Sequence, residues 1–278
     1  MATVNRIEIL SPAKLNLFLH VTGQREDGYH TLQTVFQLLD WGDRLSFEAK
    51  ASPGVSLATA LDDVANDDNL IIKAARALDP EQQLGATIDL VKKIPMGGGL
   101  GGGSSNAAMT LLALNHLWKL DHDTDTLATL GEKLGADVPV FVRGYSCWAE
   151  GIGEEITPIE LPPRWFVILK PSCQVATAEI FRAPELTRNT PPITVSAFFA
   201  GHAKNDLQSV VETHYPEVRN ALLWLSQHGR AMMTGSGACV FASYESQSEA
   251  ERVARLAPET VNAFVAKGIN KYHGTVHH

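Results

Sequence analysis

The amino-acid sequence predicts an α+β fold divided into two domains. Segments typical of strands and of helices follow one another without the strict alternation of a doubly wound sheet. The chain has 278 residues and 45% of them are hydrophobic, which is enough to bury the core of one large domain or of two ordinary ones. The two prolines of Leu161-Pro162-Pro163 interrupt the pattern just before a new apolar segment. We therefore expect one domain over residues 1–160 and a second over residues 161–278.

The first half opens with a strand whose two faces differ. Apolar residues alternate along residues 6–21, as is typical of a half-buried strand, and the alternation places Lys14 and Asn16 side by side on one face. A polar turn then leads into the rest of the half. The expected elements, in order, are an apolar run at 32–39, a turn at 40–43, a paired strand at 44–49, a helix at 69–78, a strand at 87–94, and helices at 107–118 and 124–134.

The second half contains no internal repeat of the first. It mixes short strands with helices, and a glycine-rich hairpin turn leads into one of its strands. The expected elements are a strand at 165–169, helices at 176–182, 206–213 and 217–228, the turn at 234–237, a strand at 238–243, a helix at 246–256 and a final strand at 263–269.

Composition and charge exclude several classes of protein. A formal charge of −8 at pH 7 lacks the basic field of a general nucleic-acid binder. No segment has the length of a membrane span or the apolar region of a signal peptide, so we expect a cytoplasmic protein without a membrane partner. Three widely spaced cysteines, Cys147, Cys173 and Cys239, fit a reducing compartment. The ten histidines are scattered, with His277 and His278 interpreted as a tail, and we assign no metal ligands. The sequence does not predict the oligomeric state.

The most informative segment is rich in glycine. Six of the seven residues from Gly97 to Gly103 are glycine, and Ser104, Ser105 and Asn106 follow. An amphipathic strand precedes the segment and an alanine- and leucine-rich helix follows it, whereas a flexible linker is not normally held between two such elements. Glycines allow positive φ and expose successive N–H groups, and a helix N-terminus favours anions. This glycine loop, residues 97–103, is therefore predicted to bind a polyphosphate.

Two common phosphate-binding motifs do not describe this loop. The Walker motif needs a lysine after its last glycine, and none follows Gly102 or Gly103. The dinucleotide-binding pattern is met by Gly97, Gly99 and Gly102, but so many glycines make that match nearly automatic. A dinucleotide fold would also place an acidic residue at the end of a second strand about twenty residues on. Asp121 stands near that distance in a segment typical of a turn.

Several segments together resemble the GHMP small-molecule kinases. The main ones are residues 11–17, 95–108 and 234–239, whose order and spacing span almost the whole chain. Within that family, residues 28–32 and 134–141 resemble the branch that phosphorylates 4-diphosphocytidyl-2-C-methyl-D-erythritol, and Asn205-Asp206-Leu207 also fits. The resemblance implies a kinase of the non-mevalonate isoprenoid route that transfers phosphate from ATP, with Mg²⁺, to the 2-hydroxyl of this cytidyl substrate. It also implies a two-domain GHMP kinase fold: a ribosomal-protein-like ATP-binding domain and a ferredoxin-like C-terminal domain, with the site in the cleft between them.

Lys14 and Asp137 are the candidate catalytic residues. Phosphoryl transfer needs neutralised charge and an oriented nucleophile. Asp137 follows a helix end in a tight segment before Pro139, where its alternative role is to cap the next turn, but the resemblance favours a catalytic base. Lys14 would stabilise charge that develops on the substrate oxygen, and its alternative role is an edge lysine whose charge reaches solvent. The sequence leaves open whether Asp137 removes the proton or only orients the hydroxyl.

The remaining candidates bind the two substrates. The ATP-binding set comprises Pro95, Met96, Gly97, Gly98, Gly99, Leu100, Gly101, Gly102, Gly103, Ser104, Ser105 and Lys92. Ser104 and Ser105 are candidates to contact phosphate or Mg²⁺, and which of them does so stays open, whereas Lys92 has the alternative of being an ordinary surface lysine. The cytidyl-binding set comprises Asn16, Tyr29, His30, Thr177 and Phe181. Aromatic faces can sandwich a base, although Tyr29 and His30 could instead pack the hairpin, and Phe181 the core.

Three other functions compete with this one. Another GHMP kinase, acting on homoserine or a mevalonate derivative, would have a substrate without a base for Tyr29 and His30 to contact. A non-catalytic nucleotide sensor on the same fold has no need of both Lys14 and Asp137. An RNA-binding module, suggested by the fold shared with translation proteins, is disfavoured by the acidic charge.

Overall fold

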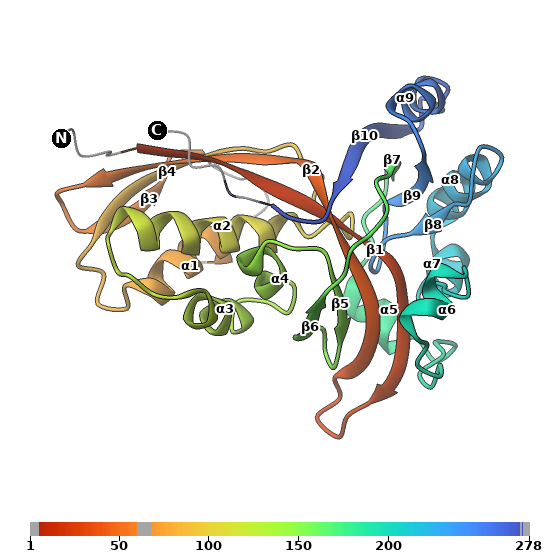
Figure 1. Ribbon diagram of the computed structural model, residues 1–278, viewed down its shortest axis with the longest axis horizontal. Helices are drawn as coiled ribbons and strands as arrows, with labels where there is room; N and C mark the ends of the chain where they lie inside the picture. The colour runs from red at the N-terminus through yellow and green to blue at the C-terminus, as the bar shows by residue number, and fades with distance from the viewer. Residues whose placement is uncertain (1–5, 60–67, 273, 275–278) are drawn as a thin grey trace.

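A computed structural model describes residues 6–59, 68–272 and 274 of the chain. The tail of His277 and His278 lies outside these residues. Within them, strands and helices are mixed around one continuous sheet (Figure 1). The main path of the sheet runs in the order β3 (Gly54–Leu57), β4 (Gly85–Val91), β2 (His30–Lys50), β10 (Val261–Ile269), β7 (Trp165–Pro171), β9 (Val240–Tyr244) and β8 (Met232–Met233). The α+β class predicted from the sequence is confirmed. Among the described residues, no helix has the length and apolar character needed to cross a membrane.

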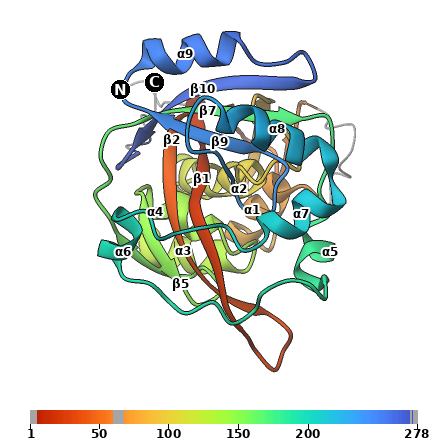
Figure 2. The same cartoon turned by 90° about the vertical axis from the view of Figure 1, so that its right-hand side faces the viewer.

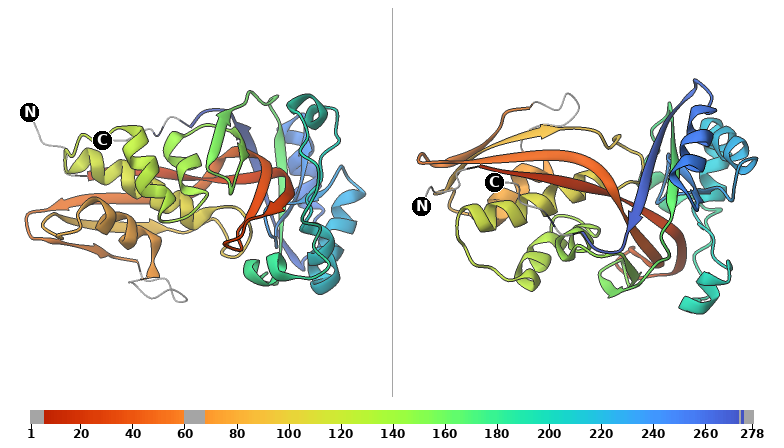
Figure 3. Two further views of the ribbon diagram at one scale, coloured as in Figure 1. Left: turned by 90° about the horizontal axis from the view of Figure 1, so that it is seen from below. Right: turned by 45° about the horizontal axis from the view of Figure 1, so that its top comes forward.

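Two long antiparallel strands form the axis of the molecule. They are β1 (Arg6–Gln24) and β2 (His30–Lys50). In space they extend from the part of the molecule formed by the first half of the chain to the part formed by the second half (Figure 3). Shorter strands extend the sheet on β2: β4 (Gly85–Val91) pairs with it antiparallel, and β3 (Gly54–Leu57) pairs parallel with β4. β5 (Cys147–Glu150) also pairs with β2, and β6 (Glu155–Pro158) pairs with β5.

The turn expected at residues 40–43 is absent, because β2 continues through it. Gly42 pairs with Pro12 of β1 and Asp43 pairs with Ser11. A side chain at Gly42 would place its Cβ 1.9 Å from the carbonyl oxygen of Ser11, so only glycine allows the two backbones this approach. The polar and glycine residues at 40–43 are typical of a turn, but here they lie within β2, and Gly42 allows β1 and β2 to pair closely. The predicted turn was wrong for that reason.

Four helices cover one face of the first half (Figure 1). They are α1 (Leu70–Leu78), α2 (Gly102–Leu117), α3 (Thr124–Glu132) and α4 (Val138–Arg143). Asn69 and Asp123 cap α1 and α3 through their side chains. α2 contacts β1, β2 and all three neighbouring helices, and its small alanines allow this close packing on several sides. The helix expected at 107–118 in fact begins at Gly102, within the glycine loop.

The second half packs helices on one face of its strands, as Figure 2 shows for α7, α8 and α9. The strands are β7 (Trp165–Pro171), β8 (Met232–Met233), β9 (Val240–Tyr244) and β10 (Val261–Ile269). The helices are α5 (Thr177–Arg182), α6 (Val195–Phe199), α7 (Gln208–His214), α8 (Pro216–Ser226) and α9 (Gln247–Arg255). β10 pairs with β7 and, at its end, with β2, where Gly268 lies opposite Leu39. The final strand therefore ties the second half to the first.

Candidate active site

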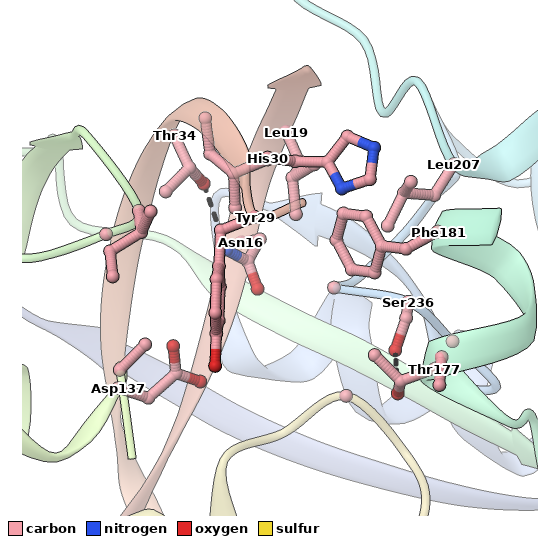
Figure 4. A pocket seen from close by; sticks show the side chains of 18 of the residues that line it. Asn16, Leu19, Tyr29, His30, Thr34, Asp137, Thr177, Phe181, Leu207 and Ser236 are labelled. Carbon is pink, nitrogen blue, oxygen red and sulfur yellow. Dashed lines mark hydrogen bonds between the residues drawn. The ribbon is translucent and has the colours of Figure 1, made fainter. Parts of the chain in front are cut away.

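A cleft of about 1170 Å³ lies where the two halves meet. It is lined by β1, β2, the glycine loop, the start of α4, α5 and the turn at residues 234–237. The structure brings all seven predicted catalytic and cytidyl-binding residues to the walls of this cleft, several of them drawn in Figure 4: Lys14, Asn16, Tyr29, His30, Asp137, Thr177 and Phe181. Gly97, Gly99 and Gly101 of the predicted ATP-binding set also line it. A smaller cavity of about 340 Å³ adjoins it on the other side of the glycine loop.

Lys14 and Asp137 form an ion pair inside the cleft. Lys14 Nζ lies 3.3 Å from the carboxylate of Asp137 and donates a 2.5 Å hydrogen bond to Asn16 Oδ1. Lys14 is only 3% exposed, so its charge depends on these partners and on the face of Phe36, whose ring centre lies 5.1 Å away. The alternative role of Lys14 as an edge lysine that reaches solvent is therefore not supported.

The carboxylate of Asp137 does not cap the following helix, which was the alternative role that the sequence left open. It stands at the N-cap of α4 but makes no capping hydrogen bond. Its side chain stays 29% exposed beside the cleft, whereas Lys14 behind it is buried. Asn16 is fixed in turn, because its amide donates to Thr34 Oγ1 at 2.9 Å (Figure 4). The carboxylate of Asp137 thus faces the cleft and is paired with the buried ammonium group of Lys14.

The glycine loop combines positive φ angles with a helix start. Gly97, Gly99 and Gly101 have φ angles of +64°, +74° and +72°, whereas Gly102 and Gly103 are already the first residues of α2. The first intrahelical bond runs from Ser105 N to Gly101 O, so the preceding amides of the helix have no acceptor within it. The helix has 16 residues, and its N-terminus faces the smaller cavity. Orphan amides and the helix dipole together favour an anion here.

A second glycine segment supports this loop from behind. Ala238 N donates to Gly97 O and Cys239 N to Gly98 O, at 3.1 and 3.2 Å. A Cβ on Gly99 would lie 2.3 Å from the carbonyl oxygen of Thr234, so the two backbones are in close contact. Asn205 holds the second segment through Nδ2, which donates to the carbonyls of Met233 and Gly235. The resemblance motif at residues 234–239 therefore acts as the support of the glycine loop.

Asp43 is a residue near the loop that the sequence analysis missed. Its fully buried carboxylate accepts hydrogen bonds from the amides of Lys93 and Ile94, at 2.6 and 2.7 Å, and pairs with Lys92 Nζ at 2.7 Å. Lys92 lines the smaller cavity, as expected of a nucleotide contact, but its charge is shared with Asp43. The composition of residues 40–43 predicted a turn. For that reason the sequence analysis missed Asp43, a strand residue that hydrogen-bonds the segment just before the glycine loop.

The two loop serines differ in their surroundings. Ser105 is buried, and its hydroxyl oxygen accepts a 2.8 Å hydrogen bond from Ser11 Oγ. Ser104 is half-buried in the first turn of α2. Neither serine is among the residues that line the cleft or the smaller cavity, and Ser104 is the more exposed of the two.

Aromatic side chains lie at the far end of the cleft. The rings of His30 and Phe181 are 5.2 Å apart between centres and tilted by 34° (Figure 4). Burial, and secondly the charge of Arg188, lower the pKa of His30, so its ring stays neutral near pH 7. Tyr29 is 64% exposed and so does not pack the hairpin. Thr177 and Ser236 share a 2.6 Å hydrogen bond between them. The cleft therefore joins a charged end to an aromatic end.

Comparisons with known proteins agree with this geometry. The family model of the GHMP kinases N terminal domain matches residues 69–145, and that of the GHMP kinases C terminal domain matches residues 194–262. A protein of Pseudomonas fluorescens named 4-diphosphocytidyl-2-C-methyl-D-erythritol kinase is 53% identical over 270 residues, which are 96% of this chain and 95% of that protein. The chain belongs to the GHMP kinase family. This GHMP kinase therefore uses ATP as its phosphate donor and a small molecule as acceptor.

Solved structures show the same relation at the level of the fold. A crystal structure of 4-(cytidine 5'-diphospho)-2C-methyl-D-erythritol kinase superposes with a TM-score of 0.82 at 35% identity, covering 94% of this chain and 98% of that one. The homoserine kinase from Cytophaga hutchinsonii reaches a TM-score of 0.67 at 18% identity, covering 98% of this chain and 96% of that one, and shares the fold alone. The two-domain GHMP kinase fold expected from the sequence is confirmed, while the roles of individual residues remain predictions.

Proposed function

We propose that this GHMP kinase transfers the γ-phosphoryl group of ATP to the 2-hydroxyl of 4-diphosphocytidyl-2-C-methyl-D-erythritol. The products are the 2-phosphate and ADP, in the non-mevalonate route to isoprenoid precursors, and the reaction takes place in the cytoplasm. The observation that carries the proposal is one cleft with the Lys14–Asp137 pair beside the glycine loop and an aromatic pair at its other end. The name of the relative that is 53% identical supports the same substrate.

The charged end of the cleft would carry the transfer itself. Asp137 accepts a hydrogen bond from the 2-hydroxyl and takes up its proton. The hydroxyl oxygen then bonds to the γ-phosphorus, while the bond from that phosphorus to the bridging oxygen of ADP breaks. Lys14, which is buried behind the carboxylate, offsets the negative charge that gathers on the attacking oxygen. A nucleotide sensor would need neither residue in this arrangement.

The glycine loop fits the phosphates of ATP. Backbone amides at the start of α2 point into the smaller cavity, and Lys92 and Asn106 line the same space. Mg²⁺ would accompany the phosphates, because it usually keeps waters and phosphate oxygens as ligands and needs few protein groups. In the described part of the chain, no cluster of three His, Cys, Asp or Glu side chains could hold a metal ion by itself. We assign the Ser104 hydroxyl to phosphate or Mg²⁺.

The aromatic end of the cleft would bind the cytidyl group. Tyr29 is exposed and can cover one face of a base, while Phe181 presents its ring beside His30 on the opposite wall. Thr177, on α5, would face the diphosphate. We propose that residues 1–160 bind ATP and supply the reacting groups, and that residues 161–278 complete the substrate site.

A coupled assay of ADP release tests the function. Purified protein with ATP and Mg²⁺ should turn over the cytidyl substrate, and should give no rate above background with homoserine or mevalonate. Phosphorus NMR of the product should show a new phosphate monoester and an intact diphosphate. Turnover of homoserine or mevalonate at equal or higher kcat/KM would contradict the substrate and leave only the family.

A further inference from the structure

Arg188 holds together the two sides of the aromatic end of the cleft. Its Nε donates to His30 Nε2 at 3.1 Å, across 158 positions of sequence. Its Nη2 donates to the carbonyl oxygens of Phe181 and Ala183, at 3.0 and 2.8 Å, and its Nη1 donates to that of Leu186 at 3.1 Å. A single half-buried guanidinium thus connects the start of β2 to the end of α5.

The bond to His30 fixes the position of a proton. A guanidinium only donates and cannot lose its proton in a protein, so the nitrogen that it faces must accept. His30 Nε2 therefore carries a lone pair, and the proton of the neutral ring sits on Nδ1. Burial and the positive charge of Arg188 both lower the pKa of His30, in agreement with a neutral ring. The ring is left with one N–H group to offer as a donor.

The bonds to the carbonyls fix the second ring. Phe181 lies in the last turn of α5, where the carbonyl groups receive no hydrogen bond from an N–H group of the same helix. Arg188 donates to the carbonyl of Phe181 and to that of the C-cap residue Ala183, which also accepts from Leu186 N, and it bonds His30 with the same planar group. Arg188 therefore bonds both the His30 ring and the backbone of Phe181, whose ring centre lies 5.2 Å from that of His30.

We propose that Arg188 is a positioning residue for the pyrimidine. It holds His30 as the tautomer protonated on Nδ1, beside Phe181, so that the ring donates a hydrogen bond to an acceptor atom on the edge of the base. This inference rests on the proposed function, because it needs a base in the cleft. Arg188 also lines the cleft, so a direct attraction between its charge and the substrate diphosphate is the competing explanation.

NMR of the side-chain nitrogens tests the tautomer without any substrate. In uniformly ¹⁵N-labelled protein, the His30 ring is identified by the loss of its signals in His30→Gln. We expect a protonated Nδ1 and an unprotonated Nε2 at pH 7 in the wild-type protein. Arg188→Met should shift His30 towards the tautomer protonated on Nε2, or towards a mixture. Arg182→Met, which removes a neighbouring positive charge that also lines the cleft, should leave the His30 pattern unchanged.

Steady-state kinetics test the role in binding. Arg188→Met should raise the KM for the cytidyl substrate on the order of tenfold, while kcat and the KM for ATP change by less than about twofold. Arg188→Lys keeps the charge but not the planar fork, so it should resemble Arg188→Met. In a His30→Ala background, Arg188→Met should add much less than it does alone, because the two residues act as a unit.

Separate results would overturn this inference and the proposed function. A His30 ring protonated on Nε2 in the wild-type protein overturns the role of Arg188, and this measurement stands even if the variants do not fold. If Arg188→Lys keeps the wild-type KM for the cytidyl substrate, the effect of Arg188 comes from its charge. That result, or fully additive effects of Arg188→Met and His30→Ala, also overturns the positioning role of Arg188. A wild-type protein that shows the expected tautomer but ignores the cytidyl substrate overturns the proposed function, and the pyrimidine role of Arg188 with it.

Discussion

At the residue scale, the site depends on a lysine that is almost fully buried. Lys14 would be costly as an isolated charge, and its ammonium group lies against Asp137, Asn16 and the face of Phe36. Its own amide donates to Leu100 O, so the same residue also touches the glycine loop. The cation, the carboxylate and the glycine loop are therefore coupled through one side chain and its backbone.

Replacing Asp137 with asparagine separates the chemistry from the shape of the site. The amide in Asp137→Asn would keep an oxygen near Lys14 but could not take up a proton, so kcat should fall by about 10²–10⁴-fold. The dissociation constant for a non-hydrolysable ATP analogue, measured by calorimetry, should stay within about threefold of wild type, because the glycine loop is untouched. Asp125→Asn serves as the control, since that carboxylate lies on α3, is 78% exposed and pairs with Arg143.

The outcome decides between two roles of Asp137. A kcat close to wild type in a folded Asp137→Asn protein would reduce the residue to a structural partner of Lys14. A melting temperature is needed alongside, because the substitution also leaves the buried Lys14 charge without its carboxylate.

At the scale of elements, phosphate binding depends on where α2 begins. Positive φ angles stop at Gly101, the N-cap of α2, and the following residues are helical. Substitution of Gly101 is a poor test of the loop, because a Cβ there would lie 3.0 Å from Lys14 and would disturb the Lys14–Asp137 pair as well. Gly97 is a cleaner position, since its nearest neighbour would be the flexible side chain of Gln174 at 3.6 Å.

Gly97→Ala should weaken ATP binding on the order of tenfold and leave the affinity for the cytidyl substrate nearly unchanged. A left-handed conformation costs alanine roughly 1–2 kcal/mol, and relaxation would turn the amides of the loop away from the phosphates. Gly54→Ala is the matched control, because Gly54 also has a positive φ, of +95°, and has open space around it, but lies outside the cleft. Calorimetry with an ATP analogue measures the difference. Equal ATP affinities of the two folded variants would show that the loop does not bind the phosphates.

The sequence predicted most elements, and its errors have local causes. Alternating strands and capped helices were found because burial and capping leave marks within a few residues of chain. The start of α2 was misplaced because Gly102 and Gly103 are poor helix formers, so helix propensity does not predict a helix that begins there. α4 was missed because it has only six residues and contains Pro139. In each case the chain breaks a local preference near the candidate site.

At the scale of the whole molecule, the site exists because β10 ties the two halves into one sheet. Lys14 and Asp137 were predicted from a resemblance between motifs, and the structure places them 3.3 Å apart. The bond between Arg188 and His30 had no signal in the sequence, because it depends on how α5 packs against the β1–β2 hairpin. The domain limits at 160 and 161 stay a prediction.

The length of the cleft gives the last prediction. In Figure 4 the rings of His30 and Phe181 lie across the cavity from Asp137, with Tyr29 between them, so a substrate without the cytidyl group loses the contacts of His30 and Phe181. The wild-type kinase should use 2-C-methyl-D-erythritol 4-phosphate with a kcat/KM lower by on the order of 100-fold or more than that for the cytidyl substrate. The fall should include kcat, because binding energy from the base holds the hydroxyl against Asp137.

The same comparison in His30→Ala provides the control. If the aromatic end recognises the base, removal of the cytidyl group should cost this variant less than it costs the wild-type enzyme, since part of the contact is already gone. Initial rates of ADP release for both substrates and both proteins supply the four values needed. Equal efficiencies on the two substrates in the wild-type enzyme would show that the base is not recognised, and the aromatic end of the cleft would then need another occupant.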